Sequence, residues 1–221
     1  MRSLEKIAYT LGTDKSSRIH NYCLKYEKWL PFNRLEPINI LEIGVLQGHS
    51  LLTWREYYPN AKVIGIDINP ECKNHENIDN NIFVEIGSQD DPDFLKYVID
   101  KFGPFDMILD DGSHMNSHII FSFLNLIDSL KSEGVYIVED SCTSYWEEYE
   151  GGFRKNGTAI EFFKNMVDDV NFNGQLQENF WNVHARREDF LKEQTISKGL
   201  DIRTDIESIN FLNGIIIISK N

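Results

Sequence analysis

Two pairs of acidic residues follow apolar runs in this sequence, and a histidine lies close to the first pair. The segment Asp110–His114 reads Asp-Asp-Gly-Ser-His and follows Met107–Leu109, while Glu139 and Asp140 follow Val135–Val138. If the two runs are adjacent parallel strands, their carboxyl ends face one crevice, which is where open α/β sheets bind ligands. Oxygen-rich acidic clusters favour Mg²⁺, Mn²⁺ or Ca²⁺. The pattern therefore indicates a metal site with a base beside it.

The elements that would position these residues alternate between strands and helices. Short apolar runs predict buried parallel strands at Ile38–Ile43, Lys62–Ile68, Ile82–Ile86, Met107–Leu109 and Val135–Val138. Helical spacing follows at Ser50–Tyr57, Asp91–Phe102 and Asn116–Lys131, and it also occurs near the N-terminus at Ser16–Trp29. This order predicts an α/β fold with a doubly wound, mostly parallel, Rossmann-like sheet.

The C-terminal third is less regular than the rest. We expect a helix near Thr158–Asp169 and strands near Phe180–His184 and Gly214–Ser219, which would pair as an antiparallel edge. No linker of low complexity and no internal repeat interrupts the 221 residues, so we predict a single domain over 1–221. Residues 1–35 would form a helical extension that packs on the cofactor site.

Charge and cysteine content limit the partners of this chain. Lysine and arginine number 22 against 35 aspartates and glutamates, and the net charge of −13 would repel nucleic acid and anionic membranes. Three dispersed cysteines without a Cys-x-x-Cys motif fit a reducing compartment. We find neither a signal peptide nor an apolar run of ~20 residues. A cytoplasmic protein is expected, and homo-oligomerisation is left open.

The turn after the first predicted strand has the residues of a cofactor site. Gly44 and Gly48 allow a tight turn and close approach of a ligand, and Glu42 lies two residues before Gly44. Glu42 would oppose a pyrophosphate but favour the positive charges of S-adenosylmethionine. Asp67 ends the second strand, where an acidic residue can bind ribose hydroxyls. The alternative is that these residues are solvated strand ends and ordinary turn formers.

A turn at Gly87–Asp90 follows the third predicted strand. Adenine is commonly bound at this position in such folds, so Ser88 and Asp90 complete the set of cofactor residues expected from position in the sheet.

The motif Glu-Ile-Gly-x-x-x-Gly at 42–48, followed by Gly-Ile-Asp at 65–67, resembles class I S-adenosylmethionine-dependent methyltransferases. The segments 11–15, 110–114, 139–146 and 151–152 narrow the resemblance to metal-dependent macrolide and deoxysugar O-methyltransferases of antibiotic biosynthesis. That resemblance implies that Mg²⁺ is held by Asp111, Glu139 and Asp140 and that His114 is the general base. It also implies that Asp110, Thr13 and Lys15 lie at the cofactor.

A methyl acceptor must be aligned and must lose its hydroxyl proton. A cation that binds neighbouring hydroxyls lowers the pKa of the acceptor, and a histidine such as His114 can take the proton. Residues 141–156 carry exposed-looking aromatics and a glycine pair, so they are interpreted either as a lid over a sugar, with Tyr145 and Trp146 as contacts, or as a local apolar cluster.

The predicted function is metal-dependent transfer of a methyl group from S-adenosylmethionine to a hydroxyl of a sugar or sugar-bearing small molecule. Two alternatives stay open. Proteins described as cephalosporin hydroxylases resemble the same family, and their oxidative chemistry would need redox-active iron. A cofactor-binding module without turnover would keep the same sheet.

Overall fold

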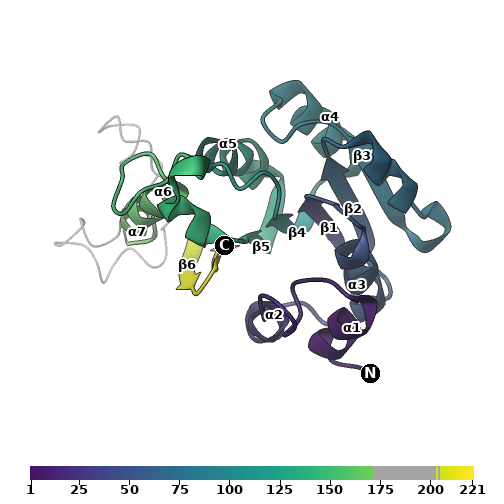
Figure 1. Cartoon of the computed structure of the whole chain (residues 1–221). Coiled ribbons are helices and arrows are strands. Elements are labelled where there is room, and N and C mark those ends of the chain that lie inside the picture. Colours follow the sequence, from purple (N-terminus) through teal and green to yellow (C-terminus); the bar gives the residue numbers. More distant parts are fainter. Residues whose placement is uncertain (172–202, 204) are drawn as a thin grey trace, which may run out of the picture.

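A seven-stranded sheet forms the centre of the molecule, with helices on both faces (Figure 1). The computed structural model describes residues 1–171, 203 and 205–221. The strand order is β3-β2-β1-β4-β5-β7-β6, and β1 to β5 are parallel whereas β7 runs antiparallel to both β5 and β6. The strands are β1 (Asn39–Ile43), β2 (Lys62–Asp67), β3 (Ile82–Ile86), β4 (Phe105–Asp110), β5 (Leu130–Val138), β6 (Ile206–Leu212) and β7 (Ile215–Lys220). The predicted Rossmann-like class with an antiparallel C-terminal edge is confirmed.

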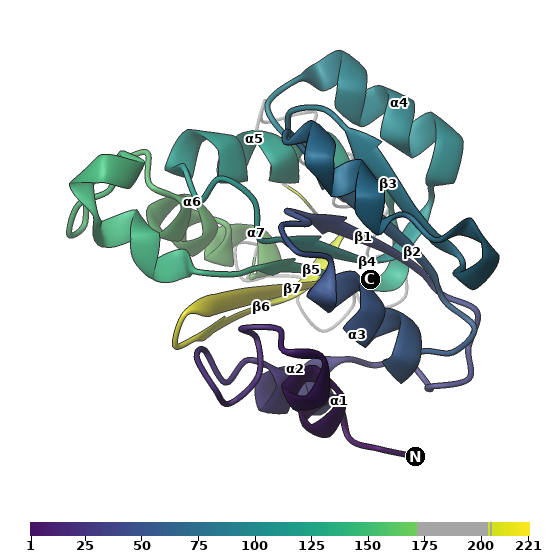
Figure 2. The same cartoon turned by 45° about the vertical axis from the view of Figure 1, so that its right-hand side comes forward.

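The helices divide into two layers, which Figure 2 shows on opposite sides of the sheet. The first layer holds α1 (Leu4–Leu11), α2 (Cys23–Trp29) and α3 (His49–Tyr57). The second layer holds α4 (Pro92–Phe102), α5 (Asn116–Leu126), α6 (Ala159–Asn165) and α7 (Val167–Val170). Short 3₁₀ helices lie at Pro70–His75, Ile78–Asn80, Ile127–Ser129, Ser141–Tyr145 and Glu147–Tyr149. None of the helices in the described part of the chain is long and apolar enough to span a membrane.

The alternation of side chains along each strand decides which layer a residue faces. Ile40, Met107 and Ile137 pack against α1 to α3, and their sequence neighbours Leu41, Ile108 and Tyr136 pack against the other layer. Continuing the first row by two residues from Ile40 and Ile137 reaches Glu42 and Glu139, and continuing it by four residues from Met107, past Leu109, reaches Asp111 just after the end of β4. These three carboxylates therefore converge on the face covered by the N-terminal helices.

The order of the strands reverses at β1, because β2 and β3 lie to one side of it and β4 and β5 to the other. Ile43 pairs with Ile66 of β2 and with Asp110 of β4, so all three strands end at the same height. Such a switch point leaves a crevice outside the carboxyl ends of the strands. The fold thus places Gly44, Asp67 and Asp111 around one opening.

The N-terminal region differs from the prediction. A helix was expected over Ser16–Trp29, but α2 begins only at Cys23, and α1 occupies Leu4–Leu11. Between them the backbone turns, and the carbonyl of Lys15 accepts hydrogen bonds from the amides of Tyr22 (2.8 Å) and Cys23 (3.1 Å). The buried Lys15 side chain requires this turn, because it reaches the carboxylates beneath the N-terminal layer.

The helix predicted over Asn116–Lys131 ends at Leu126, since Leu130 already belongs to β5 and pairs with Phe105 across an irregularity in the ladder. The helix expected near Thr158–Asp169 is present as α6 and α7, and Thr158 caps it by accepting a hydrogen bond from the Glu161 amide (3.4 Å).

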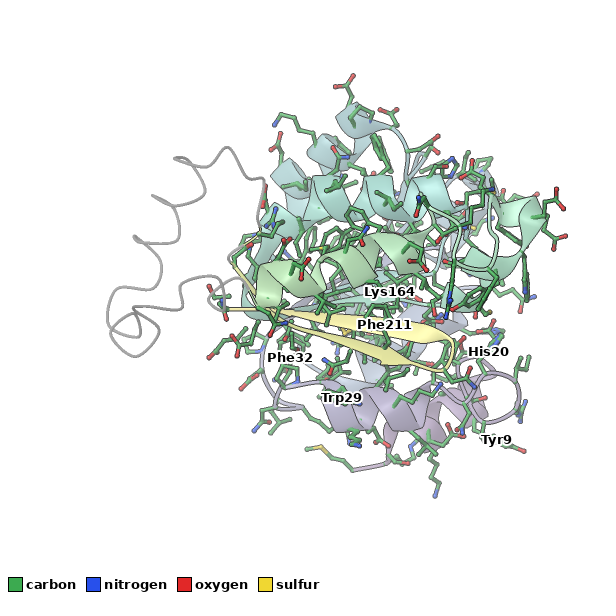
Figure 3. The ribbon with its side chains drawn as sticks, turned by 90° about the vertical axis from the view of Figure 1, so that its left-hand side faces the viewer. Tyr9, His20, Trp29, Phe32, Lys164 and Phe211 are labelled. Carbon is green, nitrogen blue, oxygen red and sulfur yellow. The ribbon has the colours of Figure 1, made fainter. Side chains whose placement is uncertain are left out.

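The last strand is β7, as predicted, and its hairpin partner is β6, which the sequence did not indicate. The strand predicted at Phe180–His184 lies outside the described residues. Figure 3 shows the hairpin of β6 and β7 between the N-terminal helices, which carry Trp29, and α6, which carries Lys164. The hairpin turn therefore lies near both the N-terminal layer and the segment that follows β5.

Candidate cofactor and metal site

A cavity of about 410 Å³ opens at the carboxyl ends of the central strands. The N-terminal turn closes one side of it through Thr13, Asp14 and Lys15. Besides Thr13 and Lys15, six other residues singled out from the sequence line this space, namely Glu42, Gly44, Asp67, Asp111, His114 and Asp140. Several of the expected cofactor residues and part of the acidic cluster thus share a single cavity.

Asp111, His114 and Asp140 form a compact group in which one potential ligand atom from each lies within 4.8 Å of the others. His114 Nε2 is 3.8 Å from Asp140 Oδ2. Both residues have left-handed backbone conformations, with φ of +60° for His114 and +46° for Asp140. Such conformations are uncommon for residues other than glycine, although Asp and His adopt them more often than most, and they cluster at functional sites. Two carboxylates and an imidazole at this spacing can hold a divalent cation.

Glu139 lies outside that group, although the sequence pattern included it among the metal ligands. Its Oε2 accepts a hydrogen bond from Lys15 Nζ at 3.0 Å, and its Oε1 accepts one from the Tyr26 hydroxyl. Burial raises the pKa of the Glu139 carboxyl well above its ordinary value, and the nearby Asp111 carboxylate raises it further. Its predicted role as a metal ligand stays a prediction.

Lys15 is the cation of this buried cluster. Its Nζ contacts Asp111 and lies 3.5 Å from Glu42 Oε1, in addition to its bond to Glu139. Burial lowers the pKa of Lys15, but the attraction of these carboxylates outweighs burial and raises it well above the ordinary value. The ammonium therefore stays charged and compensates three acidic groups. Lys15 lines the cavity, but its ammonium group contacts carboxylates. Its predicted role in cofactor binding stays a prediction.

Glu42 is completely buried, and neither of its carboxylate oxygens has a hydrogen-bond partner among the described residues. Burial raises its pKa to about 7, against the opposing attraction of Lys15. Its only charged partner in the described part of the chain is Lys15, 3.5 Å away, and a buried carboxylate that accepts no hydrogen bond is costly unless a ligand satisfies it. A positively charged group of a bound cofactor would do so, which fits the sulfonium and ammonium of S-adenosylmethionine.

Gly44 has no room for a side chain. Its φ is +93°, and an added Cβ would lie 2.1 Å from the backbone oxygen of Asp111. Glycine at this point therefore allows the first turn and the acidic segment to approach each other. Gly48 is the N-cap of α3 and lies outside the cavity lining, where a Cβ would meet the His75 ring at 2.7 Å.

Asp67 holds the loop after β1 in place. One of its oxygens accepts hydrogen bonds from the amides of Val45 (2.8 Å) and Leu46 (3.1 Å), and the other accepts one from Asn69 (2.8 Å). Burial acts to raise the pKa of Asp67, but these amides outweigh it and lower the pKa. The side chain is thus ionised, and Asp67 lines the cavity where ribose hydroxyls were expected.

A narrower cavity of about 200 Å³ continues from the first and shares Gly44, Asp67 and Gly112 with it. Ser88 lines this cavity, and its predicted contact with the adenine stays a prediction. Asp90 does not line this cavity. Its carboxylate accepts a hydrogen bond from the Ser88 hydroxyl and lies 3.4 Å from His118 Nε2.

Gln89, in the same turn, is buried and was not among the residues expected at the cofactor. Its Oε1 accepts the Ser113 amide (2.7 Å), and its Nε2 donates to Asp110 (3.2 Å). Asp110 faces the α5 layer, where burial raises its pKa to about 7. Its side chain therefore lies on the opposite face of the sheet from Asp111, and it lines neither of these two cavities. The only signal for Gln89 in the sequence was its place in the turn after the third strand.

The other side of His114 and Asp140 opens onto a cavity of about 460 Å³, which includes Trp146 and Tyr149. The Tyr22 hydroxyl donates a 2.6 Å hydrogen bond to Asp140 Oδ1. Trp146 is 48% exposed here, whereas Tyr145 lines a separate cavity. The segment 141–156 is tied to α5, since Asn116 Nδ2 donates to the Tyr149 carbonyl (2.6 Å). Closure of this segment as a lid stays a prediction.

Fold and site together define a Rossmann-like methyltransferase domain. Residues 41–141 match the family described as "Methyltransferase domain". The curated relatives are sugar O-methyltransferases. L-olivosyl-oleandolide 3-O-methyltransferase of Streptomyces antibioticus is 34% identical over 180 residues, covering 76% of this chain and 46% of the relative. Mycinamicin VI 2''-O-methyltransferase of Micromonospora griseorubida is 30% identical and covers 76% of this chain and 44% of the relative.

The predicted resemblance to the macrolide and deoxysugar O-methyltransferases is thereby confirmed, and the chain spans less than half the length of these two relatives. A solved structure of the MycE methyltransferase in complex with Mg, S-adenosylhomocysteine and mycinamycin VI has a similar fold. It has a TM-score of 0.81 at 23% identity and covers all of this chain and 54% of the solved one. This likeness supports the strand order and the layers described above.

Proposed function

We propose that the protein transfers a methyl group from S-adenosylmethionine to a hydroxyl of a sugar or sugar-bearing small molecule, with the help of a divalent cation. The observation that carries the proposal is the single cavity lined both by the buried carboxylate of Glu42, which accepts no hydrogen bond from the described residues, and by Asp111, His114 and Asp140. The relatives support the reaction, because they are named as O-methyltransferases of glycosylated natural products.

The residues present fit both groups. Glu42 would bind the positive end of the cofactor, Asp67 the ribose, and the Ser88 side of the narrow cavity the adenine. Asp111 and Asp140 would hold Mg²⁺, with Mn²⁺ or Ca²⁺ as alternatives, and Glu139 is part of the proposed set. When bound, S-adenosylmethionine supplies an electrophilic methyl group, and the cation lowers the pKa of the acceptor hydroxyl.

His114 would take the proton from the acceptor. Its imidazole lies between the cofactor cavity and the cavity that holds Trp146, because His114 lines both. Asp140 Oδ2, at 3.8 Å, would stabilise the imidazolium that forms. The acceptor would therefore enter from the Trp146 side. A homo-oligomer and a location in the cytosol remain parts of the proposal that rest on the sequence.

The first test is calorimetric titration of S-adenosylhomocysteine into the protein, followed by titration of Mg²⁺ into the wild type and Asp111→Asn. We expect both ligands to bind the wild type and Mg²⁺ binding to be lost in the variant. Asp100→Asn, an exposed position on α4, is the matched control and should bind Mg²⁺ normally. Failure of S-adenosylhomocysteine to bind would reject the methyltransferase proposal. Turnover with Mg²⁺ under anaerobic conditions excludes the oxidative alternative.

The role of His114 is tested by His114→Ala. We expect turnover to fall by about 10²-fold or more, which is the usual contribution of a general base, with unchanged affinity for S-adenosylhomocysteine. A weakened affinity for Mg²⁺ would assign His114 to the cation instead of to the proton. Near-normal turnover would remove it from both roles.

A further inference from the structure

His20 is a second imidazole beside Asp140, and the chemistry described above does not use it. Its Nδ1 lies 3.9 Å from Asp140 Oδ1, whereas His114 Nε2 lies 3.8 Å from Oδ2 of the same carboxylate. Each histidine is thus next to a different oxygen of Asp140. Both also line the cavity of about 460 Å³, which we call the acceptor cavity. Figure 3 shows His20 near the turn of the β6–β7 hairpin, whose Asn213 and Gly214 line the same space.

The ring of His20 is held by stacking. It packs on the ring of Tyr22, with centroids 5.1 Å apart and 20° between the two planes. Tyr22 is itself fixed by its 2.6 Å hydrogen bond to Asp140. The turn that carries His20 does not depend on the imidazole, because the His20 amide donates to the Asp14 carbonyl at 3.0 Å. The side chain can therefore be replaced without opening the turn.

Neither ring nitrogen of His20 forms a hydrogen bond within the described part of the chain. Nδ1 is 3.9 Å from Asp140 Oδ1, and Nε2 is 3.9 Å from Asp14 Oδ2, and both distances are too long for a direct hydrogen bond. One oxygen atom can bridge a gap of this size. A hydroxyl suits the gap at Asp140, since it donates to the carboxylate and accepts from an imidazole N–H.

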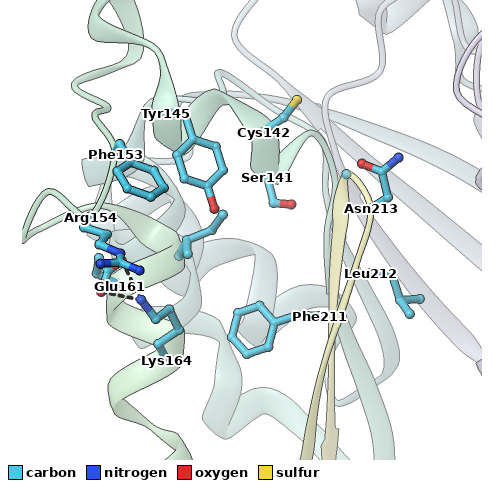
Figure 4. A pocket seen from close by; sticks show the side chains of 12 residues that line it. Ser141, Cys142, Tyr145, Phe153, Arg154, Glu161, Lys164, Phe211, Leu212 and Asn213 are labelled. Atoms are coloured by element: carbon cyan, nitrogen blue, oxygen red, sulfur yellow. Dashed lines mark hydrogen bonds and ion pairs between the residues drawn. The ribbon is translucent and has the colours of Figure 1, made fainter.

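The acceptor cavity adjoins the cavity drawn in Figure 4, which has a volume of about 470 Å³ and shares Cys142 and Gly214 with it. Neither His20 nor His114 belongs to the described lining of that adjoining cavity. The hydroxyl that reacts at His114 must therefore lie in the acceptor cavity, and a hydroxyl next to it on the same sugar lies within reach of His20.

A sugar presents neighbouring hydroxyls of similar chemistry, and an enzyme must choose between them. Two relatives from Streptomyces olivaceus are named for methylation at the 2' and the 3' position of a rhamnosyl group. A cation that binds two neighbouring hydroxyls acts on both, so a further group must decide which of them meets the methyl group. Two imidazoles at the two oxygens of one carboxylate provide unequal places for such a pair.

We propose that His20 binds the acceptor hydroxyl adjacent to the one that is methylated, and that it thereby determines which of the two reaches His114. This inference rests on the proposed function and makes it more specific, because the acceptor must then carry two free neighbouring hydroxyls. The bound hydroxyl bridges His20 Nδ1 and Asp140 Oδ1. His20 contacts the acceptor but not the reacting oxygen, so it is a specificity-determining residue.

The test is calorimetric titration of methyl α-L-rhamnopyranoside, and of analogues that each lack one ring hydroxyl, into protein loaded with S-adenosylhomocysteine and Mg²⁺. We expect His20→Ala to bind the complete glycoside about five- to tenfold more weakly than the wild type, which is the effect of one lost hydrogen bond. One analogue alone should bind both proteins equally, because it lacks the hydroxyl that His20 holds.

The position of methylation gives a second readout. With S-adenosylmethionine and Mg²⁺, the wild type should methylate the hydroxyl next to the one identified by calorimetry. His20→Ala should give a mixture of two monomethyl ethers, which nuclear magnetic resonance distinguishes. His20→Asn, whose amide nitrogen can take the place of Nδ1, should restore both the affinity and the selectivity.

Ser17→Ala is the matched control, since Ser17 is an exposed residue of the same turn, and it should bind the glycoside like the wild type. His20→Ala should bind Mg²⁺ normally. A parallel loss of Mg²⁺ affinity would show that His20 only positions Asp140, and this outcome overturns the proposal. Equal losses with every analogue, an unchanged affinity for the complete glycoside, or no binding of any glycoside to the loaded wild type also overturn it. Failure of S-adenosylhomocysteine to bind would instead reject the proposed function.

Discussion

The residues of the site carry more negative charge than one cation site requires, and Lys15 explains how the fold tolerates it. Glu42, Asp111 and Glu139 approach the same ammonium beneath the N-terminal layer. Carboxylates this deeply buried are stable only when paired. Lys15 is therefore a positioning residue, which holds Asp111 beside the cavity and neutralises its neighbours.

Replacing Lys15 with methionine should expose this dependence. We expect Lys15→Met to lower the free energy of unfolding by about 3 kcal/mol in the presence of chelator, because the buried Glu42 and Glu139 and the partly exposed Asp111 lose their common partner. Saturating Mg²⁺ should restore more stability to this variant than it adds to the wild type. The measurement is thermal unfolding with chelator and with Mg²⁺. Lys96→Met removes an exposed ion pair and should change stability by less than about 0.5 kcal/mol.

Glu42 should make stability depend on pH near neutrality. Its folded-state pKa, raised to about 7, lies above the ordinary value of 4.5, so the folded protein binds the proton more tightly than the unfolded chain. The associated stability is fully present below the unfolded pKa and is lost as pH rises through the folded pKa. Between about pH 5.5 and 8.5 the wild type should lose roughly 2 kcal/mol that Glu42→Gln does not lose.

This comparison uses urea unfolding of both proteins in chelator at a series of pH values. Parallel pH profiles for the wild type and Glu42→Gln would show that Glu42 is ionised in the folded state at all these pH values. The cofactor-free protein is required, because a bound sulfonium would hold Glu42 ionised.

At the scale of elements, β1, β4 and the turns that follow them form the framework of the site. Backbone contact between the two turns is possible only because Gly44 lacks a side chain. The same turn places the amides of Val45 and Leu46 on Asp67. A change at Gly44 should therefore disturb the cofactor side and the acidic side together.

We compare Gly44→Ala with Gly157→Ala to test this. Both glycines have positive φ, +93° and +85°, but an added Cβ at Gly157 meets nothing within 4 Å. Gly157→Ala should cost only the backbone strain, about 1 kcal/mol. Gly44→Ala should cost at least about 2 kcal/mol more and abolish Mg²⁺ binding, because Asp111 must move. Equal destabilisation in urea, with Mg²⁺ binding retained, would show that the contact is unimportant.

At the scale of the whole molecule, both ends of the described chain meet at the site. The Tyr22 hydroxyl donates to Asp140 and lies 3.3 Å from the carbonyl oxygen of Gly214, which is 192 residues away in the sequence. Lys25 Nζ donates to the neighbouring Asn213 carbonyl. The N-terminal helices and the C-terminal hairpin thus hold Asp140 in position at the cavity.

Tyr22→Phe removes this link without changing the size of the side chain. Loss of the hydrogen bond to a carboxylate should lower the free energy of unfolding by about 1.5 kcal/mol and weaken Mg²⁺ binding about tenfold, since Asp140 is no longer oriented. Calorimetric titration of Mg²⁺ measures the second effect. Tyr97→Phe is the control, because the Tyr97 hydroxyl donates a hydrogen bond to Glu85 on the surface. This variant should bind Mg²⁺ like the wild type.

The strands of the parallel sheet, and the location of the site at their carboxyl ends, could be predicted from the sequence alone. Predicted strands of three to seven residues, each with Gly, Asp or Glu near its carboxyl end, suffice for this, because parallel strands put their carboxyl ends at one edge. The same alternation places Glu42, Asp111 and Glu139 on one face and Asp110 on the other. The sequence was less informative about β6 and about where α5 ends, since these depend on pairing with distant strands.

The contacts between side chains within the site depend on how distant elements pack, so they could not be predicted from the sequence. Lys15 lies 96 residues from Asp111 and 124 from Glu139, and no local pattern brings them together. The packing of the N-terminal layer on the sheet makes that contact, and it separates Glu139 from the group of Asp111, His114 and Asp140. Local periodicity fixes the direction of a side chain, whereas its partner is fixed by the elements that pack above it.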